Sequence, residues 1–484
     1  MTFGGTKSSG SPSVLRGIAS WRSWLQFIRD PLAYLAATQN RFGALCVLGN
    51  PLPIWRGGRR FVFAVGGEYA RQVLGQPDVF RTGGQVMLGP RGSALYRIRR
   101  GLFAMNGPRH RANRRLMQPP FSKSAVASYA ATIAQLIDQI VDRWRLDETL
   151  DIYREMRTLS NWVAAHILFG NEDFAASIEI GNAIEELLAL DARARKNPIW
   201  LDMPGTPFGR LLRQAERMEA LMRQCIERGR KNASQGTDVI SILIRALDTQ
   251  TLQMRETDVI AHAFILYAAS FETTANALAW SLFLISQHPS IASDLHDEIN
   301  SQIATWPPDQ PTIDALPLLE GVVLEALRLM PPVPFTFRTA RRDVELGDIL
   351  LHDGDKVILN HFHTQRNADL FHEPNRFNPA RWFGVRPDPY EFTPFSGGPR
   401  LCLGYSFALL ELKLTIVRVM QRFRLTVAPG AAIDGIVQLT LRPRRGIPMI
   451  VHAQDRAFMA SPITGNIRQM IDFRALPEFA PDAR

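Results

Sequence analysis

The longest apolar stretch of the sequence, VIAHAFILYAASFETTANALAWSLFLI, covers residues 259–285. Its length is sufficient for a helix that crosses a bilayer. Polar residues interrupt it, however, and Glu272 lies near its centre, where a carboxylate in lipid would be costly. The stretch therefore predicts a long helix buried inside a soluble protein, with a polar cluster at its middle.

The rest of the chain is mostly helical, with a smaller amount of β structure near both ends. Proline suits a first helical turn, so an early helix is expected from Asp30-Pro31. Strand-like runs follow at 44–49 and 60–66. Helical spacing of apolar residues dominates from about 108 to 330, and proline-punctuated strands follow it.

The domain organisation follows from where the candidate functional residues lie. Length alone suggests two or three domains, but these residues extend from about 107 to 404, so one domain over 26–455 is expected. Residues 1–25 begin with a Gly/Ser-rich stretch without an apolar run, which predicts a disordered leader and neither a signal peptide nor an anchor. Residues 456–484 are expected to be an extension, and the sequence assigns them no function.

The charge balance is strongly basic, with a formal net charge of +10 at pH 7. Such an excess suits an acidic protein partner, a nucleic acid or an anionic membrane, and composition does not choose among them. No recognisable nucleic-acid module accompanies the scattered arginines, so nucleic acid is not expected as a partner. Three cysteines without paired spacing indicate a reducing compartment, and a cytoplasmic monomer is expected.

A glycine-rich loop, FSGGPRLCLG, places Cys402 directly before a stretch with helical spacing. A lone cysteine beside a turn can be an inert buried thiol. Here Arg400 and the coming helix N-terminus both favour a thiolate, and the flanking glycines allow a bulky group to approach. Structural zinc needs further ligands that nothing near Cys402 supplies. A single thiolate is one of the ways in which proteins hold haem iron.

The loop resembles the haem-binding loop of the cytochrome P450 family, written Phe-x-x-Gly-x-Arg-x-Cys-x-Gly. The matching positions are Phe395, Gly398, Arg400, Cys402 and Gly404. The resemblance implies that Cys402 is the axial ligand of the iron in haem b. It also implies a mainly helical fold with a small β subdomain, in which haem lies between the central helix and the helix after Cys402.

Basic residues elsewhere match positions that bind the haem propionates in the family. His110 and Arg114 lie one helical turn apart in NGPRHRANRRLM, which could otherwise be a basic surface helix. Arg338 in PFTFRTA resembles another propionate-binding arginine. Several convergent cations are what a group with two carboxylates requires.

A further pair, Glu325 and Arg328, is three residues apart and shares a helix face. Such a pair is usually a solvated surface contact, but its surroundings here are mostly apolar. With Arg376 of Pro-x-Arg-Phe, the pair resembles the Glu-Arg-Arg network of the family, which has a structural role near the cysteine loop.

The centre of the apolar stretch, AASFETTA, resembles the oxygen-activating segment of the family. Glu272 and Thr273 match its acid–alcohol pair, which delivers protons, and Ala269 matches the small residue beside the haem face. In isolation, the threonine could simply bond back to the helix. Ser270 replaces the usual glycine, which leaves the detail of the oxygen groove open.

The resemblance implies a monooxygenase that inserts one oxygen atom from O2 into a substrate. The pocket-lining segments supply apolar residues, so a fatty acid, terpenoid or similar lipophilic substrate is expected. These residues are Phe264, Leu266, Val333, Phe335, Val437 and Leu439. A non-catalytic haem sensor or a peroxide-driven or isomerising haem-thiolate enzyme remains the alternative, and the Glu272-Thr273 pair favours the monooxygenase.

The electrons for this reaction must come from separate proteins, because the chain carries neither a dinucleotide-binding fingerprint nor an iron–sulfur cysteine set. We expect a ferredoxin with its reductase, or a flavodoxin, to relay them from NAD(P)H. Lys413, Arg418 and Arg422 on the helix after Cys402, together with Arg115, predict a docking surface for such an acidic carrier. A competing non-haem iron site at His361, His363 and Asp355 has far weaker support.

Overall fold

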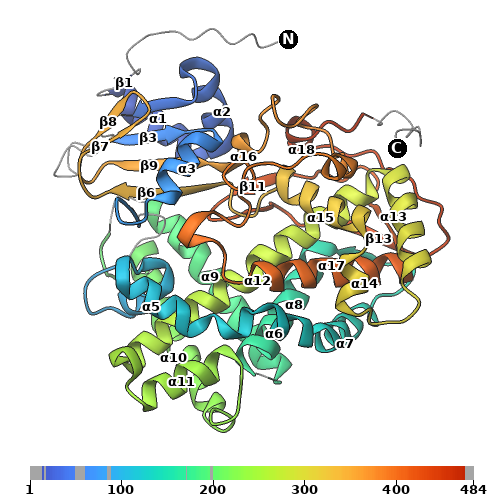
Figure 1. The fold of residues 1–484 in the computed structure, drawn as a ribbon, viewed down its shortest axis with the longest axis horizontal. Coiled ribbons are helices and arrows are strands. Elements are labelled where there is room, and N and C mark those ends of the chain that lie inside the picture. The colour runs from blue at the N-terminus through green and yellow to red at the C-terminus, as the bar shows by residue number, and fades with distance from the viewer. Residues whose placement is uncertain are drawn as a thin grey trace.

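The computed structural model describes residues 14–15, 18–48, 60–83, 89–170, 172–196 and 200–474. Long helices form most of the molecule (Figure 1). They are α5 (Gly107–Met117), α7 (Ala130–Val141), α8 (Ile152–Val163), α9 (Phe174–Lys196), α10 (Pro207–Gly229), α11 (Val239–Asp248), α12 (Glu256–Ser286), α13 (Pro289–Gln302), α15 (Pro317–Leu329) and α17 (Tyr405–Arg422).

The remaining helical elements complete the helical part of the fold. The α-helices among them are α1 (Ile18–Arg29), α2 (Pro31–Phe42), α3 (Gly67–Gly75), α4 (Ala94–Ile98), α6 (Lys123–Ser128), α14 (Gln310–Asp314), α16 (His361–Thr364) and α18 (Ile467–Met470). Single tighter or wider turns are η1 (Leu102–Ala104), η2 (Pro119–Phe121), η3 (Ala164–Leu168), η4 (Thr251–Gln253), η5 (Pro379–Phe383) and η6 (Gly398–Arg400).

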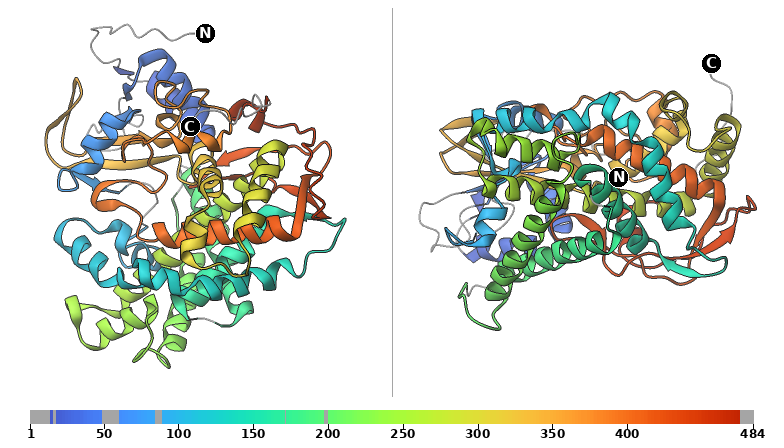
Figure 2. Two further views of the ribbon diagram at one scale, coloured as in Figure 1. Left: turned by 45° about the vertical axis from the view of Figure 1, so that its right-hand side comes forward. Right: turned by 90° about the horizontal axis from the view of Figure 1, so that it is seen from below.

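The β structure forms one larger sheet and three small ones. The larger sheet has the order β1-β2-β3-β9-β6-β4, and both views of Figure 2 place it with the N-terminal elements at one side of the molecule. Its strands are β1 (Val14–Leu15), β2 (Leu45–Leu48), β3 (Phe61–Ala64), β4 (Phe80–Thr82), β6 (Phe335–Ala340) and β9 (Lys356–Asn360). The expected early strands are therefore confirmed as β2 and β3.

The small sheets lie later in the chain. One has the order β10-β13-β5, and the other two are the hairpins β7-β8 and β11-β12. Their strands are β5 (Thr149–Asp151), β7 (Val344–Leu346), β8 (Ile349–Leu351), β10 (Phe423–Val427), β11 (Gly435–Val437), β12 (Leu441–Pro443) and β13 (Pro448–Ala453).

The helix α12 confirms the long central helix and forms the axis of the core. Asp258 fixes its first turn by accepting a hydrogen bond from the Arg255 N–H over 3.2 Å. Most side chains from Val259 onward are buried, and the helix packs against α8, α10, α15 and α17. None of the helices in the described ranges combines the length and apolar content that a bilayer crossing requires.

The N-terminal end departs from the expected leader, because α1 begins at Ile18. Phe27 holds it against the larger sheet, with its ring 5.5 Å from that of Phe63 and 5.5 Å from that of Phe335. The rest of the expected leader lies largely outside the described residues. The packing of Phe27 explains why an element forms inside 1–25.

The C-terminal extension is described as far as residue 474 and packs into the body of the protein. Ile463 and Ile467 are buried in the main core. The ring of Phe473 stacks on that of His288 at 5.9 Å, and the Asp472 N–H donates to Asn375 O over 2.9 Å. These contacts tie the extension to α12, α13 and the segment before η5.

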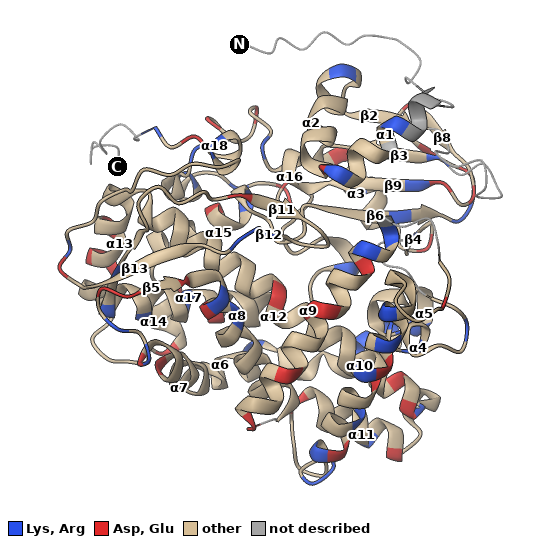
Figure 3. Cartoon of the chain, turned by 180° about the vertical axis from the view of Figure 1, so that it is seen from behind, with Lys and Arg blue, Asp and Glu red and all other residues tan. Residues whose placement is uncertain are grey.

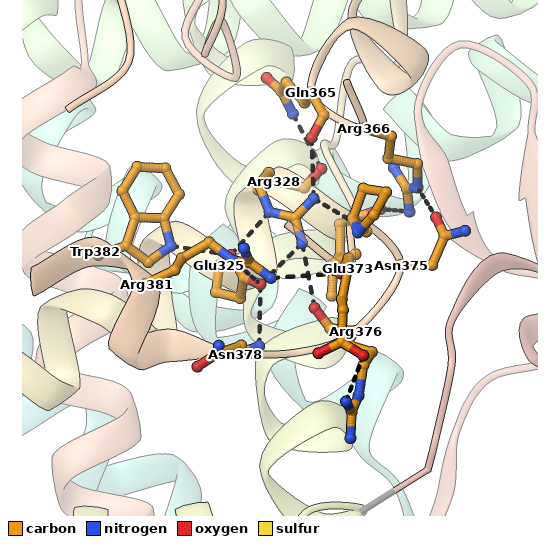
Figure 4. Close-up of polar contacts among 12 residues, drawn as sticks. Glu325, Arg328, Gln365, Arg366, Glu373, Asn375, Arg376, Asn378, Arg381 and Trp382 are labelled. Carbon is orange, nitrogen blue, oxygen red and sulfur yellow. Dashed lines mark hydrogen bonds and ion pairs between the residues drawn. The ribbon is translucent and has the colours of Figure 1, made fainter. Parts of the chain in front are cut away.

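A buried charge network around Glu325 corrects one expectation (Figure 4). Arg328 pairs with Glu325 over 2.8 Å as expected, but the second arginine on this carboxylate is Arg381, at 2.9 Å, rather than Arg376. Arg376 pairs with Glu373 over 2.6 Å. The reason is geometric, because η5 carries Arg381 across the face of α15. Burial alone would raise the pKa of Glu325, but the two arginines hold it below its usual value.

The residue Gln365 connects this network to the cysteine loop. Its carbonyl accepts a hydrogen bond from Arg328 over 2.9 Å, and its side-chain amide donates to Arg328 O over 3.1 Å. Its side-chain oxygen accepts from the Thr393 N–H over 3.0 Å, two residues before Phe395. The network therefore positions the start of the loop that carries Cys402.

Candidate active site

The loop from Phe395 to Gly404 folds back on itself and presents Cys402. The Cys402 N–H donates to Phe395 O over 2.9 Å, and the Gly404 N–H bonds to the sulfur. Gly398 has a φ of +60°, and an added Cβ would lie 2.6 Å from Leu74 O, so only glycine fits there. The ring of Phe395 packs edge-on against Tyr405, the first residue of α17, at 4.7 Å.

The three cysteines differ sharply in their surroundings. Cys46 and Cys225 are 1% and 3% exposed, and burial raises the pKa of their thiols to about 11 and about 12. Cys402 is exposed. The surrounding protein raises the pKa of its thiol, but the Gly404 N–H and the Arg114 charge oppose this rise. Among the three, Cys402 is the accessible and electrostatically assisted ligand.

Basic side chains from three elements converge beside this loop: His110 and Arg114 from α5, Arg338 from β6 and Arg400 from η6. Burial, followed by the charge of Arg400, lowers the pKa of His110 to about 4 and that of Arg338 to about 10. Burial and then Arg114 lower the pKa of Arg400 to about 10. Within the described chain, none of the three arginines forms an ion pair with a carboxylate. The cluster is therefore a strong site for an anion.

Asn106 fixes Arg400 within this cluster, and no motif in the sequence marks this role. Its Oδ1 accepts from Arg400 Nη2 over 2.9 Å, and Met105 O accepts from the same nitrogen. Arg338 donates to Phe337 O over 2.9 Å. These contacts are all to neutral oxygens, so they orient the guanidinium groups without neutralising them.

The centre of α12 carries the predicted polar groups in an unbroken helix. Thr273 Oγ1 donates to Ala269 O over 2.7 Å, and Thr274 Oγ1 donates to Ser270 O over 2.9 Å. The hydroxyl of Ser270 donates to Tyr267 O over 2.9 Å, so the serine is accommodated without a bulge. Glu272 instead reaches the hairpin β11-β12, where Thr440 Oγ1 donates to its Oε1 over 2.8 Å.

The histidines of the competing iron site have other roles. His361 lies between Thr336 and Thr393, with ring nitrogens 3.0 Å and 2.7 Å from their hydroxyls. His363 Nδ1 lies 2.8 Å from Asn360 Nδ2, and Asp355 pairs with Arg60 over 2.6 Å. The described residues contain no group of three or more metal-ligating His, Cys, Asp and Glu side chains. His361 is thus a buried core residue, and His363 is a half-buried neighbour bonded to Asn360.

The cations expected to form a docking surface on α17 are largely neutralised. Lys413 is 6% exposed and pairs with Glu320 over 2.5 Å. Arg418 pairs with Asp138 over 2.6 Å, and Arg422 pairs with Asp142. On the face shown in Figure 3, blue and red segments are likewise interspersed along α9, α10 and α11. The expectation is therefore corrected for the buried Lys413, whereas docking through Arg418, Arg422 and the exposed Arg115 on α5 stays a prediction.

The family model described as Cytochrome P450 matches residues 23–448 of this chain. The chain belongs to the cytochrome P450 family. Cyclooctat-9-en-7-ol 5-monooxygenase of Streptomyces melanosporofaciens is 30% identical to it over 446 residues, which cover 89% of this chain and 91% of the relative. Pentalenene oxygenase of Streptomyces avermitilis is 28% identical over 386 residues, with coverages of 78% and 85%.

A solved structure with the same fold is the retinoic acid-bound cyanobacterial CYP120A1. Its TM-score is 0.78 over 89% of this chain and 96% of its own, at 24% sequence identity. The mainly helical P450 fold is therefore confirmed. With the family and its relatives, the chain is a cytochrome P450 monooxygenase, an enzyme class that uses haem and O2.

The residues of this P450 fit haem on two counts. Haem carries two carboxylates, and the buried or half-buried arginines that converge here have no carboxylate partner among the described residues. The iron of haem accepts a thiolate, and Cys402 is the exposed cysteine in a loop whose amide and nearby arginine favour the thiolate. The structure brings together His110, Arg114, Arg338, Arg400 and Cys402 from segments up to about 290 residues apart.

Three contributors to the site and its support were missed in the sequence: Arg381, Asn106 and Thr440. Arg381 could have been found, because FNPARW repeats the Pro-x-Arg-aromatic pattern five residues after PNRF. The other two act through contacts between distant segments, and no local pattern marks them.

Proposed function

We propose that this P450 inserts one oxygen atom from O2 into an apolar small molecule of the terpenoid or a similar lipophilic class. The observation that carries the proposal is the convergence of an exposed cysteine with unneutralised arginines, in a chain whose helix α12 carries the acid–alcohol pair. That combination provides for a thiolate ligand, an anionic macrocycle and a proton source.

In this proposal, the converging residues hold haem b. Cys402 is the iron ligand. The guanidinium groups of Arg114, Arg338 and Arg400 bind the propionates, together with the neutral imidazole of His110 as a hydrogen-bond donor. Thiolate-bound haem supplies an iron that binds O2 and a push of electron density that favours O–O cleavage. Phe395, Gly398 and Gly404 shape the loop, and Ala269 gives α12 a small side chain beside the haem.

Reductive O2 activation consumes protons, which Glu272 relays, while Thr273 steadies the group that receives them. The Thr273 hydroxyl proton is engaged by Ala269 O, so Thr273 Oγ1 is left to accept a hydrogen bond from a protonated group in the pocket. It can thus steady such a group without giving up its own proton. Burial raises the pKa of Glu272, although Thr440, Arg157 and Arg442 oppose this rise. A carboxyl in this environment can both hold and release a proton.

The substrate class rests on the relatives and on the residues expected to line the pocket. One relative acts on cyclooctat-9-en-7-ol and another on pentalenene, according to their names. Val333, Val437 and Leu439 are partly exposed in this chain. Phe335 is less suited than expected, because it packs on Phe27 and lies on the face of β6 opposite Arg338.

Electrons reach the site from NAD(P)H through a separate ferredoxin with its reductase, or through a flavodoxin. Arg115 on α5 remains the proposed contact for an acidic carrier, because α5 also carries His110 and Arg114. The one-domain organisation over 26–455, the cytoplasmic location and the monomeric state remain predictions.

The thiolate assignment is tested by the spectrum of the reduced protein with carbon monoxide. We expect the red-shifted Soret band of thiolate ligation in the wild type, in Cys46→Ala and in Cys225→Ala, and its complete loss in Cys402→Ala. A Cys402→Ala protein that keeps the band would refute the site. For the substrate, a panel of cyclic terpenoid hydrocarbons and straight-chain fatty acids is titrated against the ferric spectrum, and a response confined to fatty acids would refute the terpenoid class.

A further inference from the structure

The hairpin β11-β12 touches the centre of α12 through one buried hydroxyl. Thr440 lies at the hairpin tip, is 4% exposed, and donates to Glu272 Oε1 over 2.8 Å. In the described part of the chain, no second side-chain hydrogen bond to Glu272 is formed. The neighbouring alcohol, Thr273, is turned to Ala269 O. The orientation of the Glu272 carboxyl therefore depends on Thr440.

The position of the Thr440 hydroxyl is fixed by contacts of the next residue. Leu441 O accepts from Trp280 Nε1 over 3.2 Å, two turns along α12 from Glu272. The Leu441 N–H donates to Pro332 O over 2.9 Å, which ties the hairpin to the segment before β6. These two contacts hold the hairpin tip in place. The Thr440 hydroxyl is therefore already positioned to bond to Glu272.

Charged and titratable groups from three other elements face the same carboxyl. Tyr153 and Arg157 come from α8, Glu185 from α9 and Arg442 from β12. Arg157 is paired with Glu185 over 2.7 Å, so that carboxylate partly neutralises its positive charge. Burial is the strongest influence and raises the pKa of Glu272. The hydrogen bond from Thr440 is the first influence that opposes it, ahead of Arg157 and Arg442.

We propose that Thr440 is a positioning residue for proton delivery. Its hydroxyl donates a hydrogen bond to the Glu272 carboxyl and keeps that carboxyl turned toward the hairpin. The inference rests on the proposed role of Glu272 in the monooxygenase. It adds a residue from a distant hairpin to the proton-delivery machinery, and it makes the protonation of Glu272 depend on where that hairpin sits.

The sign of the expected effect follows from the direction of the hydrogen bond. A donor to the carboxylate favours the charged form, so removal of the donor favours the protonated form. In Thr440→Val the shape is kept and the donor is lost, so the titration midpoint of Glu272 rises, by about one pH unit. In Thr440→Ser the donor is restored and the midpoint returns toward that of the wild type.

The experiment is an infrared pH titration of the ferric holoenzyme. The carbonyl stretch of protonated Glu272 is identified as the band lost in Glu272→Gln, and its midpoint is measured in Thr440→Val, Thr440→Ala and Thr440→Ser. Thr440→Ala keeps the test available should the β-branched valine disturb the hairpin. The matched control is Thr38→Val, which removes a buried hydroxyl that donates to Tyr34 O over 2.8 Å, far from the site in α2.

A second readout separates this inference from the proposed function. The fraction of NAD(P)H consumption that yields product is measured as a function of pH. The midpoint of this profile is expected at a higher pH in Thr440→Val and near the wild-type pH in Thr440→Ser. An unchanged infrared midpoint in both Thr440→Val and Thr440→Ala overturns the inference, as does the absence of any band that Glu272→Gln removes. Loss of the thiolate spectrum in wild type would instead overturn the proposed function, and a midpoint shift would still show the Thr440 contact.

Discussion

Two groups of arginines in this protein differ in burial and in partners. Arg328 and Arg381 are buried, whereas in the second group Arg338 is buried and Arg114 and Arg400 are half-buried. Around Glu325, Arg328 and Arg381 share one carboxylate, and each also donates to backbone carbonyls. Beside Cys402, Arg114, Arg338 and Arg400 meet each other and neutral oxygens. The charges of the first group are compensated by Glu325 of the same chain. The second carries charge that only a bound anion neutralises, which separates a structural network from a binding site.

The largest expected effect comes from removing the shared carboxylate. Glu325→Gln leaves Arg328 and Arg381 buried without a counter-charge, and the free energy of unfolding should fall by about 3–5 kcal/mol. Chemical denaturation measures this loss. Glu373→Gln is the control, because it removes a half-exposed partner of Arg376 and should cost less than about 1 kcal/mol. Equal losses of stability in the two variants would show that the buried Glu325 matters no more than the half-exposed Glu373.

In the second group, removing one charged residue is expected to increase the stability of the haem-free protein. Arg338→Met removes one of several mutually repelling cations, so the haem-free protein should melt at a higher temperature than the haem-free wild type. The same change removes a charge-assisted bond to a propionate, so haem should bind about tenfold to a hundredfold more weakly. Haem titration and thermal melting check the two halves. A lower melting temperature without haem would contradict the reading of this cluster as unneutralised.

A buried acid without a counter-charge provides a third test, because an acid can adjust by taking up a proton. Glu411 on α17 is fully buried, and burial raises its pKa to about 8 against the opposing influence of Ser160. The folded state then binds more protons than the unfolded state between pH 4.5 and about 8. The free energy of unfolding should therefore fall as pH rises through this range, by up to about 1.4 kcal/mol per pH unit.

Glu411→Gln should remove this pH dependence, since the amide has no proton to lose. Melting temperatures of the two proteins across the same pH range measure it. We expect the melting temperature of the variant to rise relative to that of the wild type as the pH increases. Parallel curves would contradict a protonated Glu411.

The smallest effect is expected at the surface, where the same contrast between paired and unpaired cations applies. Arg422 pairs with Asp142 and Arg115 has no ion pair among the described residues. Arg115→Glu should slow haem reduction by an acidic carrier severalfold at low salt, and the difference should shrink as salt is added. Arg422→Glu should have the weaker effect. The rate of haem reduction is the measurement, and equal effects would place the docking contact elsewhere.

The sequence predicted the parts of this molecule that depend on local pattern. The spacing in 259–285 predicted α12, and the loop around Cys402 and the residues His110, Arg114 and Arg338 could be assigned from motifs alone. Their convergence could not be seen, because it depends on how α5, β6 and η6 pack. The structure supplied that information.

The errors have a common physical origin. Arg376 and Arg381 both lie in Pro-x-Arg-aromatic patterns, and only the path of the chain across α15 decides which of them meets Glu325. Lys413 was placed correctly on a helix beside Cys402, but its neutralisation by Glu320 is a contact between helices. Sequence pattern reports which groups are present, whereas pairing depends on tertiary distance.

The packing of residues 456–474 has a consequence for the order in which the protein matures in the cell. Asp472 bonds to Asn375, and Arg474 O accepts from Arg376 over 3.3 Å, beside the segment that leads to Arg381. Domains form progressively as a chain leaves the ribosome. Here the contacts to Asn375 and Arg376 can form only after residue 474 has emerged. Before that point the segment that leads to Arg381 lacks these contacts, so a shortened chain presents its cysteine loop on a less constrained support.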